Sequence, residues 1–492
     1  MNIAIATAGA GSWLDRLSFW VERIDDWVWG VPLIVSILAV GVLLTAALRL
    51  GHLLNLKAAF KNIFREEDGS HGEVSAFGSL CTALSATIGT GNIVGVATAI
   101  GTGGPGALFW MEVAAFFGMA TKYAEGLLAV KYREVTPGGK VLGGPFYYIE
   151  KGLGRKWKPL AVAFAVFGIG AGLLGIGTLA QVHGISSAVR RFCDCAALQT
   201  GGVEVFGVVY PMSVVLSGLA VTVCVALVVI GGLKRIAAVS SVVVPFMAVL
   251  YVTVCLLVLL VNIAEIPNAV SVIFRAAFDP QAVTGGAVGS MIVAMQKGIA
   301  RGIFSNEAGL GSAPIAAAAA KTNEPARQGL VCMTGTFIDT IVVCSMTGLV
   351  IVISGVWEPE LGLKGVDITI EAFRRGFSFL GSCGAGISSF LLMTSLSFFA
   401  FTTILGWNYY SEKCLEYLVG ANRPWTVTLF RCLYVAMVFA GPYLTVSAVW
   451  GIADIMNGLM AFPNLVALLL LSPVVVRVSR DYFAKNGPQG SS

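Results

Sequence analysis

Long hydrophobic segments recur along almost the whole of this 492-residue chain. A helix needs about 20 apolar residues to cross a hydrocarbon core of about 30 Å, whereas a membrane β-barrel shows alternating polarity over about ten residues. Because the segments are continuously apolar, they predict an all-α polytopic membrane protein with about 11 transmembrane helices. The expected spans are 31–50, 76–100, 108–130, 160–189, 212–230, 236–263, 289–320, 330–355, 384–410, 424–443 and 446–476.

Two of these spans are interrupted by polar, glycine-containing stretches, SATIGTGNIVG at 85–95 and SNEAGLGSAP at 305–314. Glycine costs about 1 kcal/mol in a helix interior, and serine and asparagine compete for their own backbone groups. Backbone groups freed at membrane depth need partners, so such breaks survive only inside protein or beside a watery cavity. A polar loop between two helices is the alternative for the second stretch. Matching breaks in two halves of a chain favour the binding site of a transporter.

The order of the spans predicts an internal repeat. When the first span is set aside, ten remain, and the broken ones are the first and the sixth, which gives five helices plus five. The two halves would begin on opposite sides of the membrane, as an inverted repeat requires. The expected units are an N-terminal interfacial segment (1–30), an extra transmembrane helix (31–55), a first five-helix repeat (76–263), a second repeat (284–476) and a cytoplasmic tail (477–492).

Basic residues between the spans indicate the orientation. With the N-terminus outside, one set of loops carries 20 lysines and arginines and the opposite set carries 8, while 4 of the 32 lie within spans. Since cytoplasmic loops carry the excess of lysine and arginine, the sequence predicts an external N-terminus and a cytoplasmic C-terminus.

Composition narrows the class of function. The chain is 57% hydrophobic and 12% charged, with a mean hydropathy of +0.83. Its net charge of +5 comes from loop residues without the interleaved aromatics of a nucleic-acid surface. Ten cysteines without a CxxC spacing and three histidines without an HExxH pattern disfavour a metalloenzyme. A membrane-embedded enzyme is further disfavoured because no nucleophile with a paired base is found, and an ion channel because no selectivity-filter repeat is found.

Four segments resemble the alanine/glycine:cation symporter family of prokaryotic transporters: GTGNIVGVATAI at 89–100, GGPGALFWMEVAAFFGMATKYAE at 103–125, SNEAGLGSAPIAAAAAKT at 305–322 and TTILGWNYY at 402–410. The resemblance covers nearly the whole chain. It implies a leucine-transporter-like fold in the cell inner membrane, and symport of alanine or glycine with sodium as the co-transported ion. An ion channel and a proton-coupled amino acid transporter remain the alternatives.

The breaks themselves suit an amino acid zwitterion. A broken helix directs free amides of its second half and free carbonyls of its first half to one place. Thr90, Gly91 and Asn92 are therefore candidates to hold the carboxylate of the substrate, because glycine allows close backbone approach. The carbonyls around Phe304, Ser305 and Asn306 are candidates for its ammonium. Close helix crossing is the alternative role of the glycines in the first break.

The resemblance also implies a sodium site and two further substrate residues. The sodium ligands would be the hydroxyls of Thr402 and Thr403 and the carbonyls of Ser85, Ile88 and Phe399. A threonine in a membrane helix commonly bonds only the carbonyl four residues earlier, which is the alternative role.

Gln181 and Trp407 resemble pocket positions of the family. Gln181 would donate to the substrate carboxylate, and Trp407 would close the pocket around a small side chain. An interfacial anchor is the alternative for Trp407.

Charges inside spans are candidates for function or structure. Glu307 lies in the second break, where it would orient the unwound backbone or balance a cation. Lys122 and Glu125 are three residues apart on one helix, which predicts a mutual ion pair. Arg301 is expected to face an outer vestibule or a carboxylate such as Asp339 or Asp454, and Asp339 is itself a candidate for a structural or gating role.

Overall fold

The computed structural model describes residues 20–21, 23–25, 27–65, 71–193, 202–205, 208–278, 291–420, 423–443 and 446–486. Most of the expected interfacial segment (1–30) lies outside these residues. Among its described residues, Trp20 and Trp27 are exposed, whereas Trp29 is buried and its indole donates to the backbone oxygen of Asp454 at 2.7 Å. The assignment of this segment to the membrane interface stays a prediction.

The first part of the chain forms helices α2 (Val31–Ala47), α3 (Gly51–Leu54), α4 (Leu56–Ile63), α5 (Ala76–Thr87), α6 (Val94–Gly103), α7 (Gly106–Lys131), α8 (Pro145–Tyr147), α9 (Lys158–Leu174), α10 (Leu179–Phe192), α12 (Met212–Val229), α13 (Gly232–Val261) and α14 (Ile266–Phe278). The second part forms α15 (Met291–Asn306), α16 (Ala313–Ala317), α17 (Pro325–Thr336), α18 (Ser345–Ser354), α19 (Val366–Gly376), α20 (Gly384–Val419), α21 (Pro424–Ala440) and α22 (Val446–Asn486).

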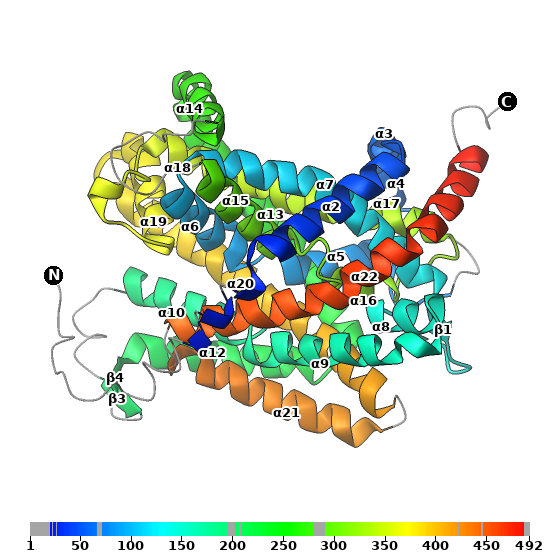
Figure 1. Ribbon diagram of the computed structural model, residues 1–492. Coiled ribbons are helices and arrows are strands. Elements are labelled where there is room, and N and C mark those ends of the chain that lie inside the picture. Colours follow the sequence, from blue (N-terminus) through cyan, green and yellow to red (C-terminus); the bar gives the residue numbers. More distant parts are fainter. Residues whose placement is uncertain are drawn as a thin grey trace.

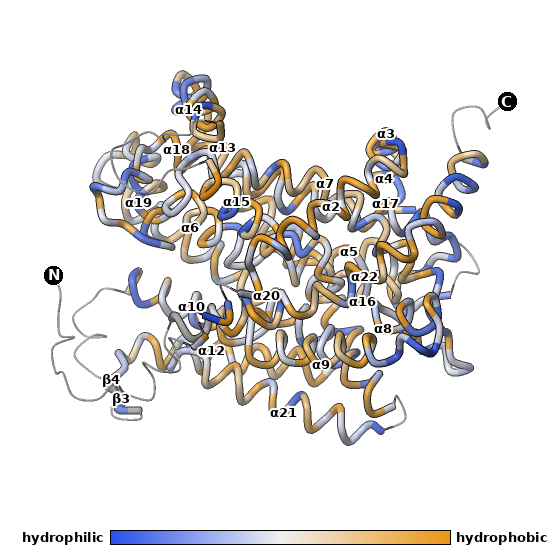
Figure 2. Tube along the Cα trace, viewed as in Figure 1, coloured by the Kyte–Doolittle hydropathy of each residue, from blue (hydrophilic) through white to orange (hydrophobic). Residues whose placement is uncertain are grey.

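Two small antiparallel hairpins lie at opposite ends of the helix bundle (Figure 1). One pairs β1 (Glu134–Val135) with β2 (Val141–Leu142), and the other pairs β3 (Gly202–Val205) with β4 (Val208–Pro211). We call these ends of the molecule the β1 end and the β3 end. Figure 2 shows hydrophobic residues along the helices between them. Large apolar side chains stay exposed there, such as Leu227, Val242 and Leu429, as expected of a surface that faces lipid.

Eight helices in the described ranges are long and apolar enough to cross a membrane, and nine spans result if the bent pair of α5 and the η1–α6 segment counts as one. The sequence predicts about 11. The remaining two expected spans fall short on length, because α2 has 17 residues and the second broken span is divided into α15, of 16 residues, and α16, of 5. An all-α multi-pass membrane protein is thus confirmed, whereas the number of 11 and the five-plus-five repeat stay predictions.

Both expected breaks are present. The first bends the chain by 61° between α5 and the segment that begins at Thr90, where a short 3-10 helix, η1 (Thr90–Asn92), intervenes. The second separates α15 from α16. A third break was not expected: the span 160–189 is interrupted between Leu174 and Leu179, within the glycine-rich sequence GIGAGLLGIGT (168–178). A π-helical stretch, η5 (Phe337–Cys344), also interrupts the helix that begins with α17.

Helix α7 is the most buried of the long apolar helices in the described ranges, and small residues let its neighbours approach closely. A Cβ on Gly298 of α15 would lie 2.1 Å from the carbonyl oxygen of Ala107, and one on Gly126 of α7 would lie 2.5 Å from Cys332 of α17. These contacts leave no room for larger side chains, so α7 holds α15 and α17 in fixed positions. The second break lies between these two helices in the sequence, and α7 therefore positions it.

Candidate substrate and cation site

The first break frees two carbonyls of α5. In an unbroken helix the amides of Gly89 and Thr90 would bond the carbonyls of Ser85 and Ala86. Instead, Gly89 donates to the side-chain oxygen of Asn92 at 2.9 Å, and Thr90 donates to Oε1 of Gln181 at 3.3 Å. The end of α5 therefore presents carbonyl oxygens that are not used by these amides, as required of a ligand-binding break.

The second break is made by left-handed backbone. Gly309 and Gly311 have φ of 90° and 82°, and Glu307 has φ of 56°. A residue other than glycine in this region costs on the order of 1–3 kcal/mol and persists only where its surroundings enforce it. The side chain of Asn306 accepts from the amide of Ala308 at 2.9 Å, which satisfies one freed donor.

Glu125 of α7 holds the second break in place. Its Oε1 accepts from the amides of Gly309 at 3.1 Å and Gly311 at 3.2 Å, and from the side chain of Asn464 on α22 at 2.7 Å. The predicted ion pair with Lys122 is wrong: among the described residues, neither Nζ of Lys122 nor Oε2 of Glu125 has a hydrogen-bond partner, and both are buried. Glu125 instead accepts hydrogen bonds from the freed amides of the break. Sequence spacing does not indicate this role of Glu125.

The two breaks lie against each other in the interior. A Cβ on Gly91 would lie 3.4 Å from the Cα of Ser305 and 3.4 Å from the ring of Phe304, although more than 200 residues separate the two stretches. Asn92, Ser305 and Asn306 are all fully buried. The structure thus brings together the two segments that the sequence predicted to share one site.

Asp339, from the π-helical stretch η5, joins the two breaks. Its carboxylate accepts from the side chain of Asn92 at 2.7 Å and from the hydroxyl of Ser305 at 2.9 Å. It also accepts from Thr340 at 2.8 Å, and Thr340 in turn accepts from Asn306 at 3.1 Å. Each break thus contributes a hydrogen-bond donor to one buried carboxylate.

Arg301 pairs with Asp454, the second of its two predicted partners, whereas Asp339 bonds to the breaks. Its guanidinium lies 3.1 Å from the carboxylate of Asp454 on α22. The same carboxylate-bearing residue accepts the indole of Trp29 through its backbone oxygen. Arg301 therefore ties α15 to α22, outside the meeting point of the two breaks.

Oxygen atoms gather where α20 crosses the end of α5. The hydroxyl of Thr403 donates to the carbonyls of Phe399 at 2.9 Å and Ile88 at 3.3 Å, so it faces both helices. The hydroxyl of Thr402 lies 3.0 Å from the Phe399 carbonyl. A Cβ on Gly406 would lie 2.8 Å from the hydroxyl of Ser85, so α20 and α5 are in close contact there. Both threonines thus bond carbonyls of their own helix, and Thr403 also reaches the first break. Hydroxyl and carbonyl oxygens are the ligands that a hard cation prefers.

Gln181 and Trp407 reach the two breaks from α10 and α20. Gln181 accepts from the first break, while its amide nitrogen is buried and has no hydrogen-bond partner in the part of the chain that the structure describes. Trp407 is fully buried, which excludes the interfacial position considered for it, and its indole donates to Glu307 at 2.9 Å. The other oxygen of Glu307 accepts from Ser312. Glu307 is thus held at both oxygens by side chains, and its role in orienting the unwound backbone stays a prediction.

A cavity of about 810 Å³ leads from the β3 end toward the first break. It lies between α6, α10, α19 and α20, and its walls include Val94, Gly184, Arg191 and Asp367. A Cβ on Gly184 would lie 2.8 Å from the methyl group of Thr90, so the cavity floor touches the break. Arg191 and Asp367 form an ion pair between α10 and α19, with one N to O distance of 2.8 Å.

At the β1 end the two broken helices are tied together. Glu73 donates its amide to the carbonyl of Ala319 at 2.8 Å, and Lys321 donates to the carbonyl of Val74 at 2.8 Å. The guanidinium of Arg133 bonds four carbonyls of the same segments, those of His71, Ala318, Ala320 and Thr322. We call Arg133 with residues 71–74 and 318–322 the clasp.

The chain is similar to known transporters over nearly its full length. The model of the sodium:alanine symporter family matches residues 14–491. An uncharacterized transporter of Haemophilus influenzae is 50% identical over 94% of this chain and 96% of its own. A sodium/alanine symporter (AgcS) of Methanococcus maripaludis is 45% identical over 94% and 96%, and a probable sodium/glutamine symporter (GlnT) of Bacillus subtilis is 34% identical over 93% and 89%.

Proposed function

The chain belongs to the sodium:alanine symporter family, and we propose that it carries small neutral amino acids, alanine and glycine first, into the cell together with sodium. The observation that carries this proposal is the contact between the two breaks, Gly91 against Ser305 and Phe304. One break supplies amides for a carboxylate, of which that of Thr90 is held by the side chain of Gln181 in this structure, and the other supplies carbonyls for an ammonium. A zwitterion is the ligand that needs both.

The surroundings of the breaks favour a small side chain on the substrate. Trp407 and Phe304 are fully buried beside them. The free amide nitrogen of Gln181 is the donor that we assign to the substrate carboxylate. Because the relative from Bacillus subtilis bears the name of a sodium/glutamine symporter, substrate size is the property to test. We expect accumulation of labelled alanine to be inhibited by glycine and much less by glutamine.

For sodium we propose the hydroxyls of Thr402 and Thr403 with the carbonyls of Ser85, Ile88 and Phe399. The support is the cluster of these oxygens at the crossing of α5 and α20. The Ser85 carbonyl has lost the amide of Gly89 as a partner, which leaves a lone pair available for a cation. In this site sodium is cargo, and the same break that binds sodium also binds the substrate, so the two would be bound together.

The mechanism that we propose is alternating access within a leucine-transporter-like arrangement of two inverted five-helix repeats. The cavity at the β3 end and the clasp at the β1 end support alternating access. The route from the β3 end to the first break is open, while the clasp holds the two broken helices together at the β1 end. The distribution of basic residues favours a cytoplasmic β1 end, which we adopt in this proposal. Transport would then require the clasp to open, and the N-terminus would lie outside.

A proton-coupled carrier and an ion channel are the competing functions. Purified protein in vesicles separates them: a symporter accumulates alanine above its external concentration when sodium is supplied, and a channel does not. If accumulation follows a proton gradient equally well without sodium, the coupling ion proposed here is wrong.

A further inference from the structure

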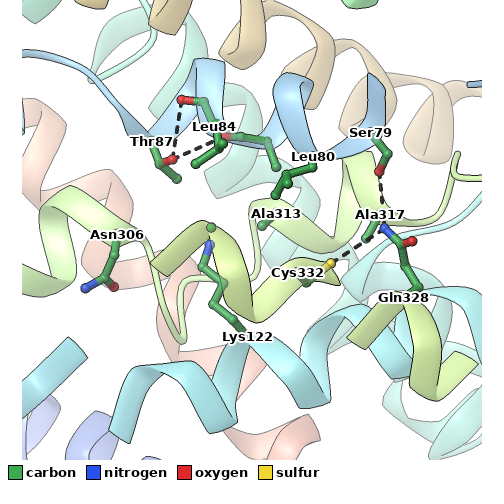
Figure 3. A pocket seen from close by; sticks show the side chains of 12 residues that line it. Ser79, Leu80, Leu84, Thr87, Lys122, Asn306, Ala313, Ala317, Gln328 and Cys332 are labelled. Carbon is green, nitrogen blue, oxygen red and sulfur yellow. Dashed lines mark hydrogen bonds between the residues drawn. The ribbon is translucent and has the colours of Figure 1, made fainter. Parts of the chain in front are cut away.

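Lys122 is a buried cation that the site described above does not use. It lies on α7, is only 3% exposed, and its ammonium has no hydrogen-bond partner among the described residues. Figure 3 shows its side chain extending from α7 into a small cavity, with Asn306 on one side and Ala313 of α16 on the other. A buried ammonium without a hydrogen-bond acceptor is costly. Nearby buried carboxylates interact with its charge, but none of them accepts a hydrogen bond from it, so an acceptor that arrives during transport would stabilise it.

The cavity itself is too small for a substrate in this conformation. Its volume of about 10 Å³ corresponds to about one water molecule. The polar side chains on its walls already have partners: Ser79 donates to the carbonyl of Ala316 at 3.0 Å, and Gln328 donates to Ser79 at 3.3 Å. Among the residues that line this cavity, Lys122 carries the charge, and its N–H groups are available to bind an acceptor.

The place of this cavity in the fold suggests its role. It lies between α5 and α16, the halves of the two broken helices that lead to the clasp, and Asn306 lines it at the meeting point of the breaks. Toward the β1 end, Val74 and Ala320 form a parallel β-bridge between the segments that flank these two half-helices. A substrate that leaves the breaks toward the β1 end between these two half-helices would pass Lys122, because Lys122 lines the cavity between them.

We propose that Lys122 forms a release subsite, where its ammonium binds the carboxylate of the amino acid after the clasp opens. The proposal rests on the proposed function. A zwitterion leaving the breaks loses the amides that held its carboxylate, and Lys122 provides replacement donors on the same route. The carboxylate in turn supplies the acceptor that Lys122 lacks in the closed conformation.

The test compares the two faces of the transporter in sodium-containing proteoliposomes. For Lys122→Gln we expect the internal alanine concentration for half-maximal efflux to rise about tenfold or more, with external half-saturation for uptake changed less than twofold. Lys131→Gln, an exposed lysine on the same helix, is the matched control and should change neither value. A structural role would instead weaken both faces or neither, and either result would overturn the subsite.

Lys122→Arg keeps the test valid if Lys122→Gln does not fold. Arginine keeps the charge and can bind a carboxylate through two nitrogens, so internal half-saturation should stay at the wild-type value or fall. A rise of tenfold in Lys122→Arg would contradict the subsite. Failure of the proposed function gives a different result, because the wild type itself would then show no sodium-dependent alanine transport.

Discussion

Replacing Gly89 by alanine tests the cation site at one atom. The added Cβ would lie 2.6 Å from the hydroxyl oxygen of Thr403 and 3.4 Å from Oε1 of Gln181. A carbon and an oxygen in ordinary contact are about 3.4 Å apart, so the hydroxyl must move by roughly 0.8 Å or rotate away. Threonine in a helix has few rotamers, so the hydroxyl has to move away from the first break, whether or not it keeps its bond to the Phe399 carbonyl of its own helix. The substitution therefore removes this hydroxyl from the carbonyl of Ile88.

We expect Gly89→Ala to remove one of the sodium ligands, the hydroxyl of Thr403. Interactions with charged groups are worth about 1.5–3 kcal/mol, and each 1.4 kcal/mol is a factor of about ten. We therefore expect Gly89→Ala to raise the sodium concentration for half-maximal alanine uptake by roughly 10-fold to 100-fold. The assay is uptake into proteoliposomes as external sodium is varied at fixed membrane potential. Thr403→Ala should give a similar shift, and the double variant should be little worse than either, because both act on one oxygen.

Gly95→Ala is the control for this experiment. It adds the same methyl group in α6, where no heavy atom of the described segments lies within 4 Å of the new Cβ, and it should leave the sodium dependence unchanged. If Gly89→Ala retains the sodium dependence of the wild type while alanine uptake persists, Thr403 and Ile88 do not bind the coupling ion.

Three further predictions concern the substrate site and the clasp. Gly91→Ala adds a methyl at contact distance and should weaken alanine uptake moderately, whereas Gly91→Val should abolish it without loss of expression; normal affinity in Gly91→Val would place the substrate elsewhere. Arg133→Lys replaces a forked donor by a point charge and should open the clasp. In a variant that keeps Cys332 as its sole cysteine, we expect maleimide to label this residue faster, and an unchanged rate would argue against a role of Arg133 in closing the clasp. Trp407→Phe removes the bond to Glu307 and should destabilise the protein by about 1–3 kcal/mol, measured by thermal unfolding; unchanged stability would show that the bond is dispensable.

Much of the site was predictable because the broken helices interrupt an otherwise apolar pattern. Gly89 to Asn92 and Ser305 to Glu307 stand out as polar residues within hydrophobic spans, and backbone chemistry alone required such breaks to face protein or a cavity. The contact of Gly91 with Ser305 followed from the assumption that two matching breaks share one site. Which atoms bind the substrate and sodium is not tested by this contact and stays a proposal.

The rest depended on contacts between distant parts of the chain. Glu125 and Lys122 are neighbours on one helix, which predicts an ion pair between them. The carboxylate of Glu125 instead accepts from the freed amides of Gly309 and Gly311. Spacing on a single helix cannot reveal a competing partner on another segment. Asp339 could be recognised as an acidic residue within a span, whereas its choice of Ser305 over Arg301 required the packing of η5 against both breaks.

The third break and the clasp were missed for different reasons. Glycines between 168 and 178 are as consistent with close helix packing as with an interruption, and no polar cluster marks the point where α9 ends. In the sequence, Arg133 is one of the 20 basic residues in the loops on one side, and such a residue indicates only orientation. Its bonds to four carbonyls depend on the termini of two broken helices meeting at the β1 end.

The central claim, coupled symport of sodium and a small amino acid, is tested most directly by alanine accumulation in proteoliposomes with external sodium or potassium at a clamped potential. One sodium entering with a zwitterion moves one charge, worth about 2.3 kcal/mol per 100 mV, and a tenfold sodium gradient adds about 1.4 kcal/mol. Together, about 3.7 kcal/mol would sustain accumulation on the order of 500-fold per sodium. We expect sodium-dependent uptake that carries inward current and increases with an inside-negative potential. Equal accumulation in potassium, or uptake that ignores the potential, would contradict the account.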